Sequence, residues 1–207
     1  MEIQAGDIFF TKLSDPSYQD WVDQLVLRQI VLYQRQFLEL PEPACEIVHA
    51  GVVTDWPRGI NSRMRGGVQE IDISKEYPAA VVLRHASCIG NPELGRKVAD
   101  EAVKLLGGKY DNWANLKFAF PVLYIWMRML CHGVLNVSKL NCIGLAVQCL
   151  RSAGLKIGWY LPTEAITPGM GFMDENMHLV TDEGAICRNM NTRAVTPEFV
   201  RAVYRKL

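Results

Sequence analysis

The segment around Cys142 has the residue types and spacing of a nucleophilic site. Cys142 follows Asn141 and opens an apolar run that is predicted to form a buried helix over residues 142–153. A helix N-terminus carries partial positive charge and N–H groups that the helix itself does not use. Both stabilise a thiolate, and the same N–H groups can bind an oxyanion. Cys142 is therefore a candidate nucleophile, with a buried core cysteine as the alternative interpretation.

Two predicted strands carry side chains that could act on this thiol. His49 lies in a segment rich in β-branched residues, and Gly51 follows it two positions later. A glycine inside a strand often marks the close approach of another group. In a later strand, alternation places Glu70 and Asp72 on one face. The alternative interpretations are a histidine satisfied within the core and an ordinary solvated strand face.

The hydrophobic patterns predict one α+β domain, with an antiparallel sheet packed against helices. The predicted strands cover residues 8–11, 46–55, 68–73, 79–85, 178–180 and 185–188. The predicted helices cover residues 18–38, 92–106, 121–135 and 142–153, with a short one starting at residue 196. Polar residues and glycines predict loops over 57–67 and 162–171.

Composition excludes several classes of protein. Of the 207 residues, 49% are hydrophobic and 21% are charged, which excludes a disordered or low-complexity chain. Lys and Arg number 22 and so do Asp and Glu, so no basic excess indicates nucleic acid as a partner. The six cysteines form no CxxC pair, which favours a reducing compartment. No signal-peptide pattern opens the chain, so we expect a cytoplasmic protein unless a leader has been removed.

Metal, cofactor and membrane-spanning signatures are weak in this sequence. His85 and Cys88 have a ligand-like spacing, but two ligands do not make a zinc site. No phosphate loop or dinucleotide fingerprint occurs, so no cofactor and no metal are expected. The longest apolar run, 118–131, contains a proline and an arginine and is too short to span a membrane. Membrane contact through 118–135 is a less favoured alternative.

Six motifs in chain order resemble the NlpC-type papain-like cysteine hydrolases. They are Gly6-Asp7-Ile8-Phe9-Phe10, His49-Ala50-Gly51-Val52-Val53, Gln69-Glu70, Val82-Leu83-Arg84, Gly108-Lys109-Tyr110-Asp111 and Asn141-Cys142-Ile143-Gly144-Leu145. Here the histidine precedes the cysteine, which resembles the circularly permuted branch that includes YiiX-like proteins and lecithin:retinol acyltransferase. The resemblance covers about residues 5–175. It implies a single permuted papain-like domain over 1–207, with helical insertions near 16–43 and 113–140.

The resemblance also implies roles for individual residues. Cys142 would attack a carbonyl to form a thioester, and His49 would take the thiol proton. Glu70 would orient the imidazole, with Asp72 as its competitor for that role. The depressed pKa expected for the Cys142 thiol would be the lowest among the six cysteines, aided by a protonated His49.

Two further residues would complete such a site. The resemblance implies that Tyr110 and Asn141 lie at the oxyanion or the substrate. The predicted helix over 121–135 is expected to flank the cleft.

The expected activity is that of a cysteine peptidase or amidase, which cleaves an amide or ester bond. Its substrate would be a peptide, such as a cell-wall peptide, or a similar amide. The alternatives are a lipid acyl hydrolase or acyltransferase, and a non-catalytic binding module in which Cys142 is inert.

Overall fold

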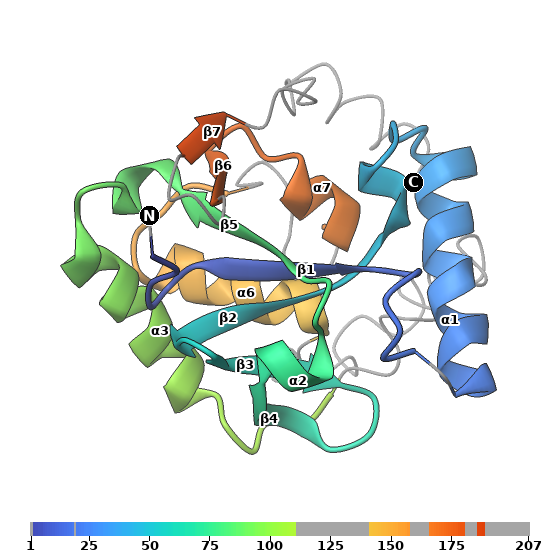
Figure 1. Cartoon of the computed structure of the whole chain (residues 1–207), viewed down its shortest axis with the longest axis horizontal. Coiled ribbons are helices and arrows are strands. Elements are labelled where there is room, and N and C mark those ends of the chain that lie inside the picture. Colours follow the sequence, from blue (N-terminus) through green and yellow to red (C-terminus); the bar gives the residue numbers. More distant parts are fainter. Residues whose placement is uncertain (1, 19, 111–140, 158–165, 181–185, 189–207) are drawn as a thin grey trace, which may run out of the picture.

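A seven-stranded antiparallel sheet forms the centre of the computed structural model (Figure 1). The structure describes residues 2–18, 20–110, 141–157, 166–180 and 186–188. The strands are β1 (Ile8–Lys12), β2 (Ile47–Asp55), β3 (Arg58–Arg63), β4 (Gly67–Asp72), β5 (Val81–His85), β6 (Met177–Val180) and β7 (Ile186–Arg188). Their spatial order is β4-β3-β2-β1-β5-β6-β7. The predicted α+β class with an antiparallel sheet is confirmed.

Helices pack on this sheet and close the core. They are α1 (Trp21–Leu32), η1 (Tyr33–Phe37), η2 (Ala44–Glu46), α2 (Ile73–Glu76), η3 (Ala86–Cys88), α3 (Pro92–Lys104), α6 (Cys142–Ser152) and α7 (Pro168–Phe172). Helices α3, α6 and α7 each contact β2, and α1 lies at the opposite end of the molecule from α3 (Figure 1). Within the described residues, no helix is long and apolar enough to span a membrane.

Helix boundaries follow the local signals in the sequence. Asn91 caps α3 by accepting a hydrogen bond from the Leu94 N–H, and Pro92 occupies its first turn. Asn141 caps α6 in the same way through the Gly144 N–H. The predicted helix over 18–38 is confirmed as α1 followed by one π-helical turn, η1. Residues 16–43 therefore contain the helices α1 and η1.

Two predictions about loops are wrong. The segment 57–67 contains strand β3, which is paired on both sides, with β2 and with β4. Its sequence, Arg-Gly-Ile-Asn-Ser-Arg, is polar and resembles that of a loop. The polar side chains of Asn61 and Ser62 are nevertheless buried in the sheet. The predicted loop over 162–171 likewise contains the start of α7, capped by Thr167. The predicted helices over 121–135 and from 196, and the expected insertion near 113–140, lie outside the described residues.

The two faces of the sheet bury separate sets of side chains. Alternation along β1 sends Ile8 and Phe10 into the larger cluster beneath the helices. Phe9 enters the smaller cluster on the other face, together with Val53 and Tyr77. Because side chains alternate along β2, those of residues 49 and 53 point to the same face of the sheet. His49 therefore lies on the face of this smaller cluster.

A buried ion pair joins the N-terminal segment to β5. The Asp7 carboxylate accepts two hydrogen bonds of 2.7 Å from the Arg84 guanidinium, and each side chain is 1% exposed. Burial raises the pKa of Asp7, and the hydrogen bonds from Arg84 oppose that shift. Asp7 and Arg84 belong to two of the six motifs noted in the sequence. In the structure these two residues have a structural role, because their ion pair ties the start of β1 to β5.

Gly51 is the position in β2 that tolerates no side chain. A Cβ built there would lie 2.4 Å from the ring of Phe9 and 2.6 Å from the carbonyl oxygen of Ile60. The expected close approach at this glycine is therefore confirmed, and the approaching group is the Phe9 ring.

We expect Gly51→Ala to destabilise the fold. Either the Phe9 ring or the β2–β3 ladder must shift, and overpacking of this kind costs about 1–3 kcal/mol. Urea unfolding monitored by circular dichroism measures the change in the free energy of unfolding. An unchanged free energy would contradict the packing described for Phe9.

Candidate active site

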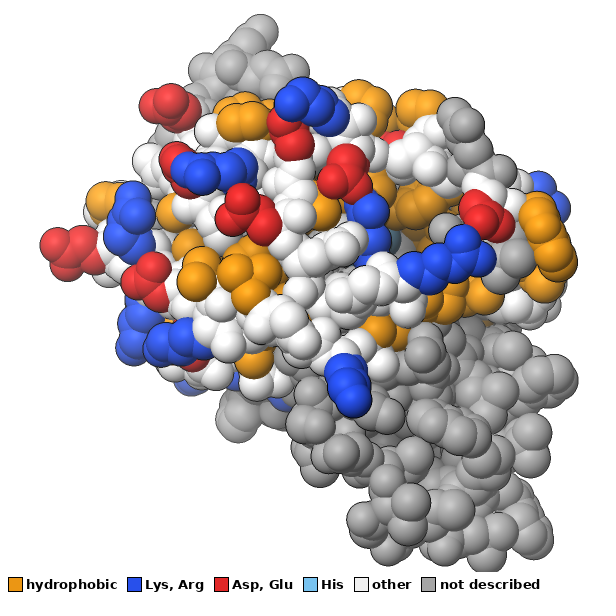
Figure 2. Space-filling view, turned by 90° about the horizontal axis from the view of Figure 1, so that it is seen from below, with side chains coloured by type: hydrophobic (Ala, Val, Ile, Leu, Met, Phe, Trp, Pro, Cys, Tyr) orange, Lys and Arg blue, Asp and Glu red, His pale blue; other side chains and the backbone are white. Residues whose placement is uncertain are grey.

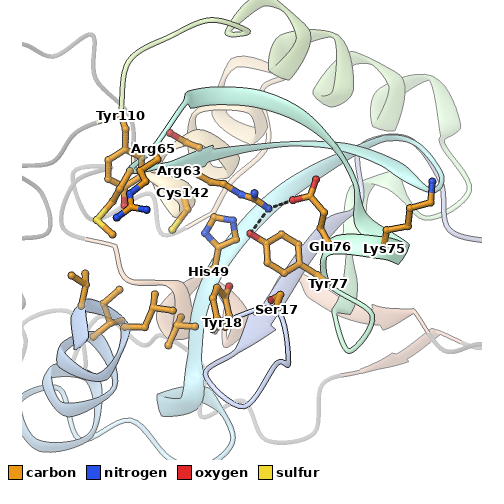
Figure 3. Close-up of a pocket in the computed structure, with 16 residues that line it drawn as sticks. Ser17, Tyr18, His49, Arg63, Arg65, Lys75, Glu76, Tyr77, Tyr110 and Cys142 are labelled. Atoms are coloured by element: carbon orange, nitrogen blue, oxygen red, sulfur yellow. Dashed lines mark hydrogen bonds and ion pairs between the residues drawn. The ribbon is translucent and has the colours of Figure 1, made fainter. Parts of the chain in front are cut away.

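Cys142 and His49 line one cavity of about 500 Å³. Cys142 is the first residue of α6, and His49 lies near the start of β2, which α6 contacts. In Figure 3 the sulfur lies beside the imidazole ring. The tertiary structure therefore brings together the two residues that the sequence singled out as nucleophile and base.

The N-terminus of α6 is organised around Cys142. The Asn141 side chain accepts a 2.6 Å hydrogen bond from the Gly144 N–H, and its backbone carbonyl accepts from Leu145. The amide of Cys142, at the first position of the helix, therefore points out of the helix end. Asn141 was expected at the oxyanion or substrate, but its Oδ1 is engaged as a helix cap. It positions Cys142 from behind.

The imidazole of His49 is held between aromatic rings. Its centroid lies 5.4 Å from that of Tyr77 and 6.3 Å from that of Phe9, and the side chain is 7% exposed. Burial lowers the pKa of His49 to about 3, and the positive charge of Arg63 acts in the same direction. His49 is therefore neutral at pH 7 and can accept a proton. The expected protonated His49 is not the resting form.

Asn61 of β3 is the residue that contacts the imidazole. Its amide nitrogen lies 3.1 Å from Nε2 of His49 and 3.4 Å from the hydroxyl of Tyr77. Asn61 pairs with Gly51 in the β2–β3 ladder, which places it diagonally from His49 on the same face. The sequence analysis missed this residue because it treated 57–67 as a loop. Asp55 lies opposite Arg58 across the turn at Trp56-Pro57, and a register shift between Val53 and Asp55 then places Asn61 opposite Gly51, which a regular hairpin would not have done.

The amide of Asn61 can engage His49 in two orientations. With the amide nitrogen donating to Nε2, the ring proton resides on Nδ1. Turning the amide by 180° places Oδ1 there instead, so that Oδ1 accepts from Nε2–H and leaves Nδ1 as the proton acceptor. In the structure, Oδ1 of Asn61 is buried with no hydrogen-bond partner among the described residues. Either orientation fixes the tautomer of the ring.

Glu70 and Asp72 do not occupy the expected position beside the imidazole. Glu70 is exposed on β4 and lies opposite Ile60 of β3. Ile60 lies opposite Val52 of β2, so the row of paired residues that contains Glu70 does not contain His49. Asp72 caps α2, and hydrogen bonds from Lys75 and Ser74 lower the pKa of its carboxyl to about 2. The expectation that Glu70 orients the ring is therefore corrected, because β3 lies between β4 and β2.

A second layer of polar side chains supports Asn61 and His49. The Arg63 guanidinium donates to the Tyr77 hydroxyl at 2.9 Å and also pairs with Glu76 (Figure 3). Burial raises the pKa of Tyr77 to about 12, so the phenol stays protonated and links Arg63 to Asn61. Sequence patterns gave no signal for this network.

Tyr110 lies on the wall of the same cavity, where Figure 3 shows it close to Arg65 and Cys142. The structure thus places the expected Tyr110 at the site. Among the other cysteines that the structure describes, three have a raised thiol pKa. Burial raises the thiol pKa of Cys45, that of Cys88 to about 11 and that of Cys149 to about 12.

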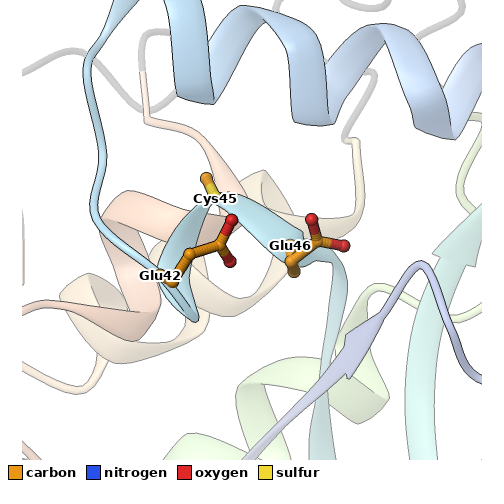
Figure 4. Close-up of side chains that lie close together, drawn as sticks. All are labelled: Glu42, Cys45 and Glu46. Atoms are coloured by element: carbon orange, nitrogen blue, oxygen red, sulfur yellow. The ribbon is translucent and has the colours of Figure 1, made fainter.

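A separate cluster of Glu42, Cys45 and Glu46 has metal-ligand residue types (Figure 4). Arg35 donates to Oε1 of both glutamates at 2.5 Å. The guanidinium therefore supplies the positive charge that balances the two carboxylates. The cluster ties η1 to η2, and acidic side chains with an arginine partner do not by themselves indicate a metal centre.

Comparison with known proteins adds no family assignment. The sequence matches no family model, and no curated protein matches it significantly.

The buried neutral His49 makes the stability of the fold depend on pH. The unfolded chain takes up a proton at His49 near pH 6.5, whereas the folded protein does so only near pH 3. Acidification between these values therefore favours unfolding, by roughly 2 kcal/mol between pH 7 and pH 5. Urea unfolding of the original protein and of His49→Gln at both pH values measures this, and the variant should lose that part of the pH dependence. Equal pH dependence in both proteins would argue against a buried neutral His49.

Asn61, rather than Glu70, should control the reactivity of Cys142. Asn61→Ala should slow alkylation of Cys142 by iodoacetamide at pH 7 about tenfold, since one hydrogen bond that fixes the imidazole is worth about 1.4 kcal/mol. Glu70→Gln is the matched control and should leave the rate unchanged. Peptide-resolved mass spectrometry reads the rate at each cysteine. The reverse order of effects would restore Glu70 as the orienting residue.

Proposed function

We propose that this chain is a cysteine-dependent hydrolase of amide or ester bonds. The observation that carries the proposal is the shared cavity in which Cys142, at a helix N-terminus, meets a neutral buried His49. Asn61 holds the ring, so the group is a Cys-His-Asn set rather than the expected Cys-His-Glu set. The chain order His49, Asn61, Cys142, with the cysteine at the start of a helix that packs on the antiparallel sheet, also supports a papain-like fold of the circularly permuted NlpC type.

The first chemical step uses the cysteine and the histidine together. Nδ1 of His49 accepts the thiol proton as the Cys142 sulfur attacks the substrate carbonyl carbon. In this arrangement Oδ1 of Asn61 accepts from Nε2–H, which stabilises the imidazolium that forms. The carbonyl oxygen becomes an oxyanion, and the Cys142 N–H is one donor for it. Tyr110 offers a second donor or a contact to the substrate.

The remaining steps return the enzyme to its starting state. The imidazolium gives its proton to the leaving amine or alcohol as the carbonyl bond to that group breaks, which leaves a thioester on Cys142. Water then attacks the thioester while His49 takes its proton, and the carbon–sulfur bond breaks. The products are a carboxylic acid and an amine or alcohol, and the thiol is restored. These steps require no cofactor.

The proposal is tested by trapping the acyl-enzyme. With p-nitrophenyl acetate as the ester and short peptide p-nitroanilides as amides, we expect turnover and a transient acetyl group on Cys142 in peptide mass spectrometry. Cys142→Ser and His49→Gln should lower kcat/KM by at least about 10²-fold, the contribution typical of general acid–base catalysis.

Cys149→Ala is the matched control, because Cys149 lies two turns further along the same helix and is fully buried. It should retain turnover and acylation. Acetylation spread over several cysteines, or turnover that survives Cys142→Ser, would overturn the proposal and favour a binding module.

A further inference from the structure

Tyr77 lies between a cation of the cavity wall and the residue that holds the imidazole. Its hydroxyl oxygen is 2.9 Å from Nη2 of Arg63 and 3.4 Å from the amide nitrogen of Asn61. That amide nitrogen is in turn 3.1 Å from Nε2 of His49. Four side chains therefore form one chain of polar contacts that ends at the base of the proposed reaction, and Figure 3 shows the bond between Arg63 and the phenol beside the imidazole ring.

This chain of contacts runs from the surface into the core. Arg63 pairs with Glu76, and their side chains are 31% and 36% exposed. Tyr77 is 4% exposed and Asn61 is fully buried. Figure 2, seen from below, shows Lys and Arg side chains next to hydrophobic ones around a hollow in the surface. The charge of Arg63 thus stays near water, while its hydrogen bond is made to a buried phenol.

The hydroxyl of Tyr77 has one proton to donate, and Arg63 limits where that proton can point. Burial raises the pKa of Tyr77 to about 12, so the phenol keeps its proton at neutral pH. Arg63 has no acceptor atom and can only donate to the phenol oxygen. The phenol proton must therefore point away from Arg63. The Asn61 amide is the other polar side chain that the described part of the chain places within hydrogen-bond distance of it.

The two orientations of the Asn61 amide differ in what they offer this proton. With the amide nitrogen toward Tyr77 and His49, the phenol proton has no acceptor and the buried Oδ1 has no partner among the described residues. With Oδ1 turned toward them, one oxygen accepts from the phenol O–H and from Nε2–H of His49. The far atom of the amide occupies the same buried position in both cases, so the phenol proton favours the second orientation.

We infer that Tyr77 is a positioning residue that selects the orientation of the Asn61 amide and thereby the tautomer of His49. With Oδ1 facing the ring, the proton of the neutral imidazole lies on Nε2, and the lone pair of Nδ1 can accept the proton of Cys142. In the opposite orientation the proton lies on Nδ1, and the ring cannot act as a base through that atom. This inference rests on the proposed function and adds to it the side chain that prepares the base before substrate binds.

The tautomer of His49 can be measured without any substrate. Long-range proton–nitrogen correlation spectra of isotopically labelled protein distinguish a protonated from an unprotonated ring nitrogen, and the signals of His49 are those missing in His49→Gln. At pH 7 we expect the Nε2–H tautomer in the original protein. In Tyr77→Phe one hydrogen bond to Asn61 is lost, which should shift the ratio of the two tautomers about tenfold toward Nδ1–H.

The Tyr77→Phe variant removes the hydroxyl and keeps the packing of the ring. The centroid of this ring lies 5.9 Å from those of Phe9 and Tyr18 and 5.4 Å from that of His49. A phenyl ring makes the same contacts, so we expect the variant to fold. Tyr33→Phe is the matched control, since Tyr33 is a buried tyrosine of the larger hydrophobic cluster and does not line the cavity. It should leave the tautomer of His49 unchanged.

Alkylation of Cys142 by iodoacetamide gives the matching kinetic readout. At pH 7, Tyr77→Phe should slow it in proportion to the loss of the Nε2–H tautomer, because only that tautomer accepts the thiol proton at Nδ1. Asn61→Asp then separates amide orientation from packing, since a carboxylate presents an oxygen to the ring whichever way it is turned. In the Asn61→Asp background, Tyr77→Phe should leave the alkylation rate unchanged.

The outcomes keep this inference distinct from the proposed function. An Nδ1–H tautomer in the original protein, or a tautomer ratio that Tyr77→Phe does not change, overturns the inference, while hydrolysis that depends on Cys142 is judged by its own test. Equal slowing of alkylation by Tyr77→Phe in both backgrounds also overturns it. Absence of Cys142-dependent cleavage overturns the proposed function and leaves the tautomer measurement valid. Loss of the Nε2–H tautomer in Tyr77→Phe, with alkylation falling in proportion, supports the inference.

Discussion

The packing of α6 against β2 is the contact on which the candidate site depends. Cys142 and His49 belong to different elements, and the two are 93 positions apart in the sequence. Burial of Ile143, Leu145 and Ala146 at the start of α6 fixes the helix end, and with it the sulfur. Small rotations of α6 would separate the two groups, so the hydrophobic core determines their geometry.

Burial has opposite consequences for the polar groups of this protein. It lowers the pKa of His49 and makes the ring a neutral acceptor, which suits a base. It raises the pKa of Cys149 and makes that thiol unreactive at neutral pH. Cys142 also lies in the core but opens onto the cavity at a helix N-terminus. Position relative to the helix end and to solvent, rather than residue type, separates a candidate nucleophile from a structural cysteine.

Two arginines at different depths illustrate two uses of charge in this protein. Arg84 is 1% exposed and donates two hydrogen bonds to Asp7 and one to the Glu2 carbonyl, which binds the N-terminal segment to the sheet. Arg63 is partly exposed, supports Tyr77 and faces the cavity. The first pair is sealed from ligands, whereas the second lies where its charge acts on His49 and on any molecule that enters.

The sequence by itself determined the local features of the site. The helix that begins at Cys142 and the close approach at the glycine two positions after His49 depend on residues a few positions apart, so local sequence rules predicted them. Only the tertiary structure decided which residue touches the imidazole. Strand β3 has a polar sequence typical of a loop, and its pairing between β2 and β4 brings Asn61 to His49 and keeps Glu70 away. Strand pairing is a non-local interaction, and a one-residue change in its register would turn every side chain to the other face.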